Sequence, residues 1–147
     1  MKTLNEITIQ YSTKDIKKER ITCSGDACTV LRSIYVESGS QIEFKEYFYI
    51  LLLNRANKVI GYHKLSEGGI NGTIADVRIA FATALKCAAS GMILCHNHPS
   101  GNTEPSEQDL TLTKKFVEAG KLLDVPVLDH IILTFGGSFS FADGGKI

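Results

Sequence analysis

The spacing of apolar residues in the N-terminal part of the chain predicts a strand followed by a helix. Apolar and polar side chains alternate over residues 7–11, as in a strand with one exposed face. Across residues 27–34, apolar side chains recur at the i, i+3, i+4 and i+7 positions that form one face of a helix. Ser24 precedes this pattern and Gly39 follows it, so we expect Ser24 to cap the helix and Gly39 to end it.

The pattern then changes to two adjacent strands. Residues 44–53 become apolar on both faces, which is typical of a central strand. A polar turn at 54–57 leads into a second strand over 58–65, and the two strands together predict a hairpin. Glycines recur within residues 66–73 and predict a surface loop.

The second half of the chain alternates helices with short strands. Helical spacing predicts helices over residues 76–89 and 106–123. The short apolar run at 92–96 lies between them and is typical of an interior strand. Residues 125–134 and 138–142 predict two further strands that pair across a turn containing two glycines.

This order of elements, β-α-β-β-α-β-α-β-β, predicts an α/β fold with a mixed sheet flanked by helices. A chain of 147 residues with 44% hydrophobic content can bury one sizeable core, so we expect a single domain over residues 1–147. The 16 basic and 16 acidic residues cancel, and no overall positive charge therefore favours binding to nucleic acid.

The sequence also indicates the cellular compartment of the protein. The N-terminus lacks the apolar core of a secretory signal, and the longest apolar run, at 47–53, is too short to span a bilayer. The four cysteines follow neither a disulfide framework nor the C-x-x-C spacing of a structural zinc site. We therefore expect a soluble, cytoplasmic protein with reduced thiols and no membrane association.

One segment and the helix after it carry the residues of a metal site. His96 and His98 are two residues apart, so on an extended backbone both imidazoles point to the same side. Asp109 follows a short loop later, near the start of a predicted helix. Two histidines and one aspartate can hold a tetrahedral zinc ion with one position open, as in catalytic zinc sites. They leave the site a charge of about +1, so the zinc would remain a Lewis acid.

Each of these residues also has a simpler possible role. A single histidine in a strand is more often a hydrogen-bonded structural residue than a ligand. Ser106 and Asp109, three residues apart before an apolar helix, fit a helix cap, and a capping carboxylate can also turn toward a metal. Cys95 adjoins His96 and should point to the opposite face of the strand, so we expect a buried thiol there and not a fourth ligand.

A hydrolytic zinc site also needs a group that takes a proton from water and returns it to the leaving group, usually a carboxylate. Glu46 is the candidate, because it stands at the entrance of the most apolar strand, on the face shared with Phe48 and Ile50. The alternative is an exposed glutamate that merely precedes a strand. Local spacing alone leaves four other carboxylates open: Glu37, Glu43, Glu67 and Asp76.

Together these residues resemble the JAMM motif of the JAB1/MPN zinc metalloprotease superfamily in order and spacing. The matching residues are Glu46, His96-Asn97-His98-Pro99 and Ser106-Glu107-Gln108-Asp109. Further segments are similar to the RadC group of that superfamily, historically labelled DNA repair proteins; they are 71–73, 93–101, 104–106, 127–130 and 140–141.

The resemblance implies an α/β fold similar to that of cytidine deaminases and cleavage of peptide or isopeptide bonds in a protein or peptide substrate. It also implies that His96, His98 and Asp109 bind Zn²⁺. Glu46 would act as general acid and base on the water molecule. Ser106 would stabilise the oxyanion of a tetrahedral intermediate, a role that hydrogen-bond donors fill in other hydrolases.

Two departures from the family pattern keep an alternative open. We expect no helix-hairpin-helix module ahead of Glu46, although RadC chains often have one, and this weakens the link to DNA. Asn97 stands where many eukaryotic deubiquitinating relatives have Ser or Thr, so ubiquitin does not follow as the substrate. The alternative function is a DNA-repair-associated accessory protein with a structural or vestigial metal.

A nucleotide deaminase is set aside, because the Pro-Cys-x-x-Cys motif of those enzymes is absent. The pair Asp129-His130 would either orient a metal ligand or form a structural contact.

Overall fold

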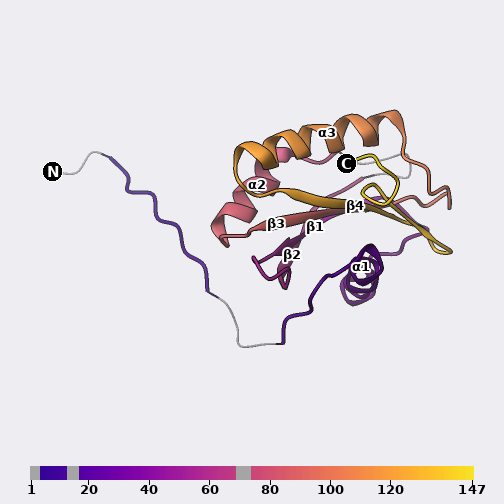
Figure 1. The fold of residues 1–147 in the computed structure, drawn as a ribbon, viewed down its shortest axis with the longest axis horizontal. Coiled ribbons are helices and arrows are strands. Elements are labelled where there is room, and N and C mark those ends of the chain that lie inside the picture. The colour runs from indigo at the N-terminus through magenta and orange to yellow at the C-terminus, as the bar shows by residue number, and fades with distance from the viewer. Residues whose placement is uncertain (1–3, 13–16, 69–73) are drawn as a thin grey trace.

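The computed structural model describes residues 4–12, 17–68 and 74–147. Within them lies a five-stranded sheet in the order β2-β1-β3-β4-β5, with helices on both faces (Figure 1). The elements are α1 (Ser24–Ser38), β1 (Tyr47–Leu53), β2 (Val59–Glu67), α2 (Val77–Lys86), β3 (Gly91–Asn97), α3 (Glu107–Leu122), β4 (Val127–Leu133) and β5 (Ser138–Ser140).

The sheet is mixed, which confirms the predicted fold class. β3 and β4 run parallel, and α3 forms the crossover between them. The other neighbouring strands are antiparallel, including the predicted β1–β2 hairpin and the β4–β5 pair. A parallel pair requires such a long connection. The first turn of α3 lies close to the carboxyl end of β3, because Asp109 contacts His98.

Side chains from the two faces of the sheet form two apolar clusters. Figure 1 shows α1 on one side of the sheet, with α2 and α3 on the other. Leu31 and Tyr35 of α1 pack against Tyr49 on the first face. Phe48 of β1 packs with Phe116 of α3 on the second face. Every residue of β1 and β3 is buried, because both strands are covered from both sides, as predicted for central strands.

The helix ends follow the predicted signals with two corrections, because Ser24 does not cap α1 and α2 ends at Lys86, before the predicted end at residue 89. Gly39 ends α1 in a left-handed conformation with φ of 70°, and the Asp76 side chain caps α2 by accepting from the Arg78 N–H. Ser24, however, does not cap α1; it is the first helical residue, and its hydroxyl donates to the Asp143 carboxylate. The Asp26 carboxylate accepts from the Thr22 N–H instead, at 2.9 Å.

The prediction of a strand over residues 7–11 was wrong. Residues 4–12 have no strand assignment, and Ile7 and Ile9 are 91% and 78% exposed. An alternating pattern makes one face of a strand apolar, but it does not provide a neighbouring strand or a core.

Part of the predicted loop over 66–73 belongs to β2, which extends to Glu67. Residues 69–73, including the RadC-like segment 71–73, lie outside the described residues. No helix in the described part of the chain is long and apolar enough to cross a membrane.

Candidate metal centre

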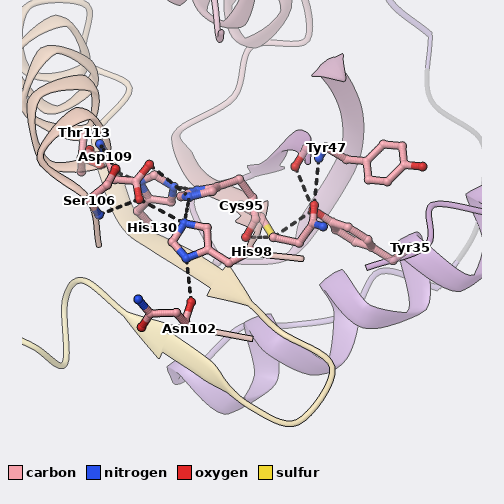
Figure 2. Close-up of polar contacts among 11 residues, drawn as sticks. Tyr35, Tyr47, Cys95, His98, Asn102, Ser106, Asp109, Thr113 and His130 are labelled. Carbon is pink, nitrogen blue, oxygen red and sulfur yellow. Dashed lines mark hydrogen bonds and ion pairs between the residues drawn. The ribbon is translucent and has the colours of Figure 1, made fainter. Parts of the chain in front are cut away.

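The three predicted metal ligands converge at the carboxyl end of β3. His96 is the penultimate residue of β3, His98 directly follows the strand, and Asp109 lies in the first turn of α3. His96 Nε2 and His98 Nε2 are 3.0 Å apart. Asp109 Oδ1 lies 3.2 Å from His96 Nε2, and Asp109 Oδ2 lies 3.1 Å from His98 Nε2. Two nitrogens and one carboxylate thus face a common point, as Figure 2 shows for His98 and Asp109.

The geometry of this group fits a small divalent cation. Around a tetrahedral zinc ion with bonds of about 2.0–2.1 Å, neighbouring ligand atoms are separated by about 3.3 Å. The separations of 3.0 to 3.2 Å are close to that spacing. Neutral imidazole and carboxylate are also the ligand types found in catalytic zinc sites. The His-His-Asp group could therefore hold a metal ion.

The neutral form of His98 is held in the tautomer that a metal requires. Its Nδ1 lies 2.7 Å from the carbonyl oxygen of Asn102, which can only accept a hydrogen bond. Nδ1 therefore carries the hydrogen, and in the neutral ring Nε2 keeps its lone pair (Figure 2). Asn102 lies in the loop between β3 and α3, and no pattern in the sequence had pointed to it.

Asp109 and His98 shift the pKa of each other. Burial raises the pKa of Asp109, but the close contacts of its carboxylate with the His96 and His98 rings outweigh burial and hold that pKa far below the ordinary value. Burial lowers the pKa of His98, but the Asp109 carboxylate and the Asn102 carbonyl outweigh it, so the pKa is raised. A proton and a metal ion compete for the same His98 nitrogen, because Nδ1 is already occupied.

The register of β1 against β3 predicts that Glu46 lies on the same face of the sheet as His96. Phe48 pairs with His96 across β1 and β3, and their rings stack with centroids 5.8 Å apart. Glu46 precedes Phe48 by one side-chain period, so the same register continued by two residues brings it opposite His98. Its charge acts on His98 and raises the pKa of that imidazole. Glu46 is half-buried, in contrast to a fully exposed glutamate.

Two of the competing carboxylates have other contacts. Glu67 forms an ion pair with Lys45 at 3.0 Å, and Asp76 caps α2. Glu37 is exposed on the last turn of α1, across the sheet from the His-His-Asp group. Glu43 is exposed and lines a surface pocket with Pro99 and Ser100, so it stays open as an alternative, and the role of Glu46 stays a prediction.

Ser106 caps α3 and links that cap to Asp109. The Ser106 hydroxyl accepts from the Asp109 N–H at 3.1 Å, and Asp109 Oδ2 accepts from the Ser106 N–H at 2.9 Å. This reciprocal capping box confirms the simpler role of both residues. It also fixes the carboxylate beside the two histidines, so that capping and metal binding use one arrangement. The hydroxyl hydrogen of Ser106, which is exposed, stays available to another acceptor.

Asn97 is a structural residue of the site whose role was not predicted from the sequence. It is fully buried, and it points to the face opposite His96. Its Oδ1 accepts from the Tyr47 N–H at 2.8 Å and the Tyr35 hydroxyl at 3.1 Å, and its Nδ2 donates to the Ile42 and Lys45 carbonyls. These bonds fasten the segment 42–47, which carries Glu46, to the strand that carries the histidines. A buried polar residue within an apolar strand requires such partners, and this was the available signal.

The other candidates near the site, Cys95, Asp129 and His130, have different surroundings. Cys95 is a free, buried thiol on the α1 face, as predicted, and burial raises its pKa. His130 lies 2.7 Å from His96, whereas Asp129 accepts from the backbone N–H groups of His130 and Ala142. Of the two predicted roles for this pair, His130 therefore contacts a candidate ligand, and Asp129 has the structural role.

Comparison with known proteins agrees with this geometry. The RadC-like JAB domain family matches residues 21–146. A UPF0758 protein of Flavobacterium johnsoniae is 48% identical over 130 residues, which cover 88% of this chain and 55% of the relative. A UPF0758 protein of Salinibacter ruber is 35% identical over 131 residues, covering 89% of this chain and 54% of the relative. The chain thus spans about half the length of these relatives, and their names state no activity.

Proposed function

This chain belongs to the RadC-like JAB domain family, and on that basis we propose that it is a zinc-dependent hydrolase of peptide or isopeptide bonds. The observation that carries the proposal is the convergence of His96, His98 and Asp109 within hydrogen-bonding distance of one another. A purely structural site would use a fourth protein ligand. Among the described residues, the group of possible ligands contains only these three.

His96 and His98 would hold the zinc ion through Nε2, and Asp109 through its carboxylate. When bound, zinc would supply Lewis acidity that makes water nucleophilic near neutral pH. The hydrogen bond from His98 Nδ1 to the Asn102 carbonyl directs the lone pair of Nε2 toward that position. The capping box holds the carboxylate there before any ligand arrives.

Glu46 would move the proton. As water attacks the carbonyl carbon of the substrate, Glu46 accepts a proton from the water and later donates it to the amine nitrogen, whose bond to that carbon breaks. Ser106 would donate its hydroxyl hydrogen to the negative oxygen of the tetrahedral intermediate. Its position at the N-terminus of α3 adds the positive end of the helix dipole to that donor.

The compartment proposed for this reaction is the cytoplasm. All four cysteines, Cys23, Cys28, Cys87 and Cys95, are free thiols. Free thiols, including the exposed Cys23, are typical of proteins kept in a reducing compartment.

The test begins with protein purified without chelators and without added zinc. We expect about one zinc per chain, and hydrolysis of members of a peptide and isopeptide library that stops on chelation and returns with zinc. Full zinc occupancy without turnover of any library member would contradict the hydrolase. Binding to duplex DNA at low salt that weakens steeply as salt rises would instead support the DNA-associated alternative.

A further inference from the structure

A buried hydrogen-bond chain leads from His96 away from the candidate metal centre. His96 Nδ1 lies 2.7 Å from His130 Nε2, His130 Nδ1 lies 2.6 Å from Thr113 Oγ1, and Thr113 Oγ1 lies 2.6 Å from the Asp109 carbonyl oxygen. His96, His130 and Thr113 are 2%, 0% and 2% exposed, so solvent does not offer these atoms alternative partners. Figure 2 draws Thr113 and His130 of this group near His98.

The direction of every hydrogen bond in this chain is determined by its last member. The Asp109 carbonyl can only accept, so the Thr113 hydroxyl donates its single hydrogen there. Thr113 must then accept from His130 Nδ1, which therefore carries the hydrogen. A fully buried ring favours the neutral form, which has one N–H, so His130 Nε2 accepts from His96 Nδ1. The neutral His96 is left with its lone pair on Nε2, the atom that faces His98 and Asp109.

Aromatic packing fixes the planes of the two rings. Phe141 stacks on His130 with centroids 4.5 Å apart and an interplanar angle of 11°. Phe48 stacks on His96 with an interplanar angle of 1°. With both ring planes held, the remaining freedom of His96 is the nitrogen that carries its hydrogen, and the hydrogen-bond chain decides that.

We propose that Thr113 and His130 are positioning residues that fix His96 in the Nδ1–H tautomer and so prepare its Nε2 as a metal ligand. The inference rests on the proposed function only in that the His-His-Asp group binds a metal. The same turn of α3 therefore contributes twice: the Asp109 carboxylate is a ligand, and the Asp109 carbonyl orients another ligand through Thr113 and His130. His98 requires no such chain, because the Asn102 carbonyl fixes it directly.

The first test is the tautomer of His96 in the metal-free wild-type protein, read from the ¹⁵N chemical shifts of its imidazole at neutral pH. We expect a protonated Nδ1 and an unprotonated Nε2. Hydrogen on Nε2, or a mixture of both forms, would overturn the proposal. This measurement requires no variant, no metal and no substrate, so neither a folding defect nor a wrong substrate can affect its result.

The second test is Thr113→Val, which keeps the shape of the side chain and removes the hydroxyl. We expect a mixed His96 tautomer and an affinity for Zn²⁺ about 10–100-fold lower, measured by competition with a chromophoric chelator. Thr113→Ser should restore both. Thr111→Val is the matched control, because Thr111 is exposed on the same helix.

An unchanged zinc affinity and tautomer in Thr113→Val would overturn the inference and leave the proposed hydrolase intact. The reverse outcome is also distinct. A wild-type protein that binds zinc tightly, loses affinity on Thr113→Val and hydrolyses no peptide would support this inference and contradict the proposed function.

Discussion

At the carboxyl end of β3, the polar side chains on the two faces of the sheet differ in whether their hydrogen-bonding atoms already have protein partners. On the α3 face, the Nε2 atoms of His96 and His98 point at each other and at a carboxylate. On the α1 face, Asn97 uses its amide in four hydrogen bonds to Tyr35, Tyr47, Ile42 and Lys45. One face keeps lone pairs available for a ligand, and the other leaves no polar atom of Asn97 without a partner.

This difference shows how one short strand serves two purposes. Side chains alternate between faces, so a histidine pair with one residue between them necessarily sends that residue to the other side. There, Asn97 holds the segment that carries Glu46 against the strand that carries the ligands. The comparison predicts that substitutions on the two faces separate metal binding, proton transfer and stability.

The largest effect should come from removing a ligand on the α3 face. We expect His98→Ala or Asp109→Ala to abolish zinc retention and all hydrolysis, because two protein ligands hold catalytic zinc poorly. The measurement is the metal content after gel filtration. His63→Ala is the control, since His63 is exposed on β2 and should leave the metal content unchanged. Zinc retained in full by His98→Ala would disprove the ligand assignment.

Glu46→Gln should separate proton transfer from metal binding. We expect turnover to fall about 10²–10⁴-fold, the usual contribution of a general acid–base group, while the zinc content is kept. Steady-state kinetics and metal analysis on the same preparation measure both. Glu37→Gln, an exposed substitution on α1, should change neither. Loss of metal in proportion to activity would contradict the role of Glu46.

Asn97→Ala tests the opposite face. It removes the partner of the buried Tyr47 N–H and of the part-buried Ile42 and Lys45 carbonyls, at about 1–3 kcal/mol each, whereas the Tyr35 hydroxyl keeps its hydrogen bond to the Tyr47 carbonyl. We expect the free energy of unfolding of the metal-free protein to fall by about 3 kcal/mol, measured by urea denaturation. Gln41→Ala, an exposed change in the adjoining loop, should have little effect. Wild-type stability in Asn97→Ala would mean that this face does not hold the loop.

The smallest effect is the dependence of zinc affinity on pH. The pKa of His98 is raised, so its proton competes with the metal at a higher pH than the proton of a free histidine would. Affinity should be highest above that pKa and fall as the pH drops through it, by at most about tenfold per pH unit for one proton. Chelator competition across about pH 6–8 measures this slope, and an affinity independent of pH would contradict the account.

Local sequence patterns correctly predicted features that depend only on residues close together in the chain. The apolar run ending in His96, the capping sequence at Ser106 and the glycine after α1 each lie within one turn or strand, and all were correctly predicted. The convergence of Asp109 on the histidines followed from the short loop that joins β3 to α3. The roles assigned to Glu46 and Ser106 stay predictions.

What the sequence could not reveal depends on contacts between distant residues. Thr113 is four residues after Asp109, a spacing that places both on one helix face, but its partner His130 is on β4. Asn97 bonds to a loop about fifty residues earlier in the chain. At residues 7–11 the alternating pattern was present, but no strand of the described residues pairs with it. Ser24 does not cap α1 because the helix begins at Ser24 itself, with Cys23 in the capping position.

The central claim is that His96, His98 and Asp109 bind one metal ion, with an open position near Glu46. Anomalous diffraction at the zinc edge, from crystals of protein purified without added metal, tests this directly. The account predicts one peak about 2.0–2.2 Å from each of the three side chains, with its fourth position open to water. A peak elsewhere, or a fourth protein ligand closing the site, would contradict it.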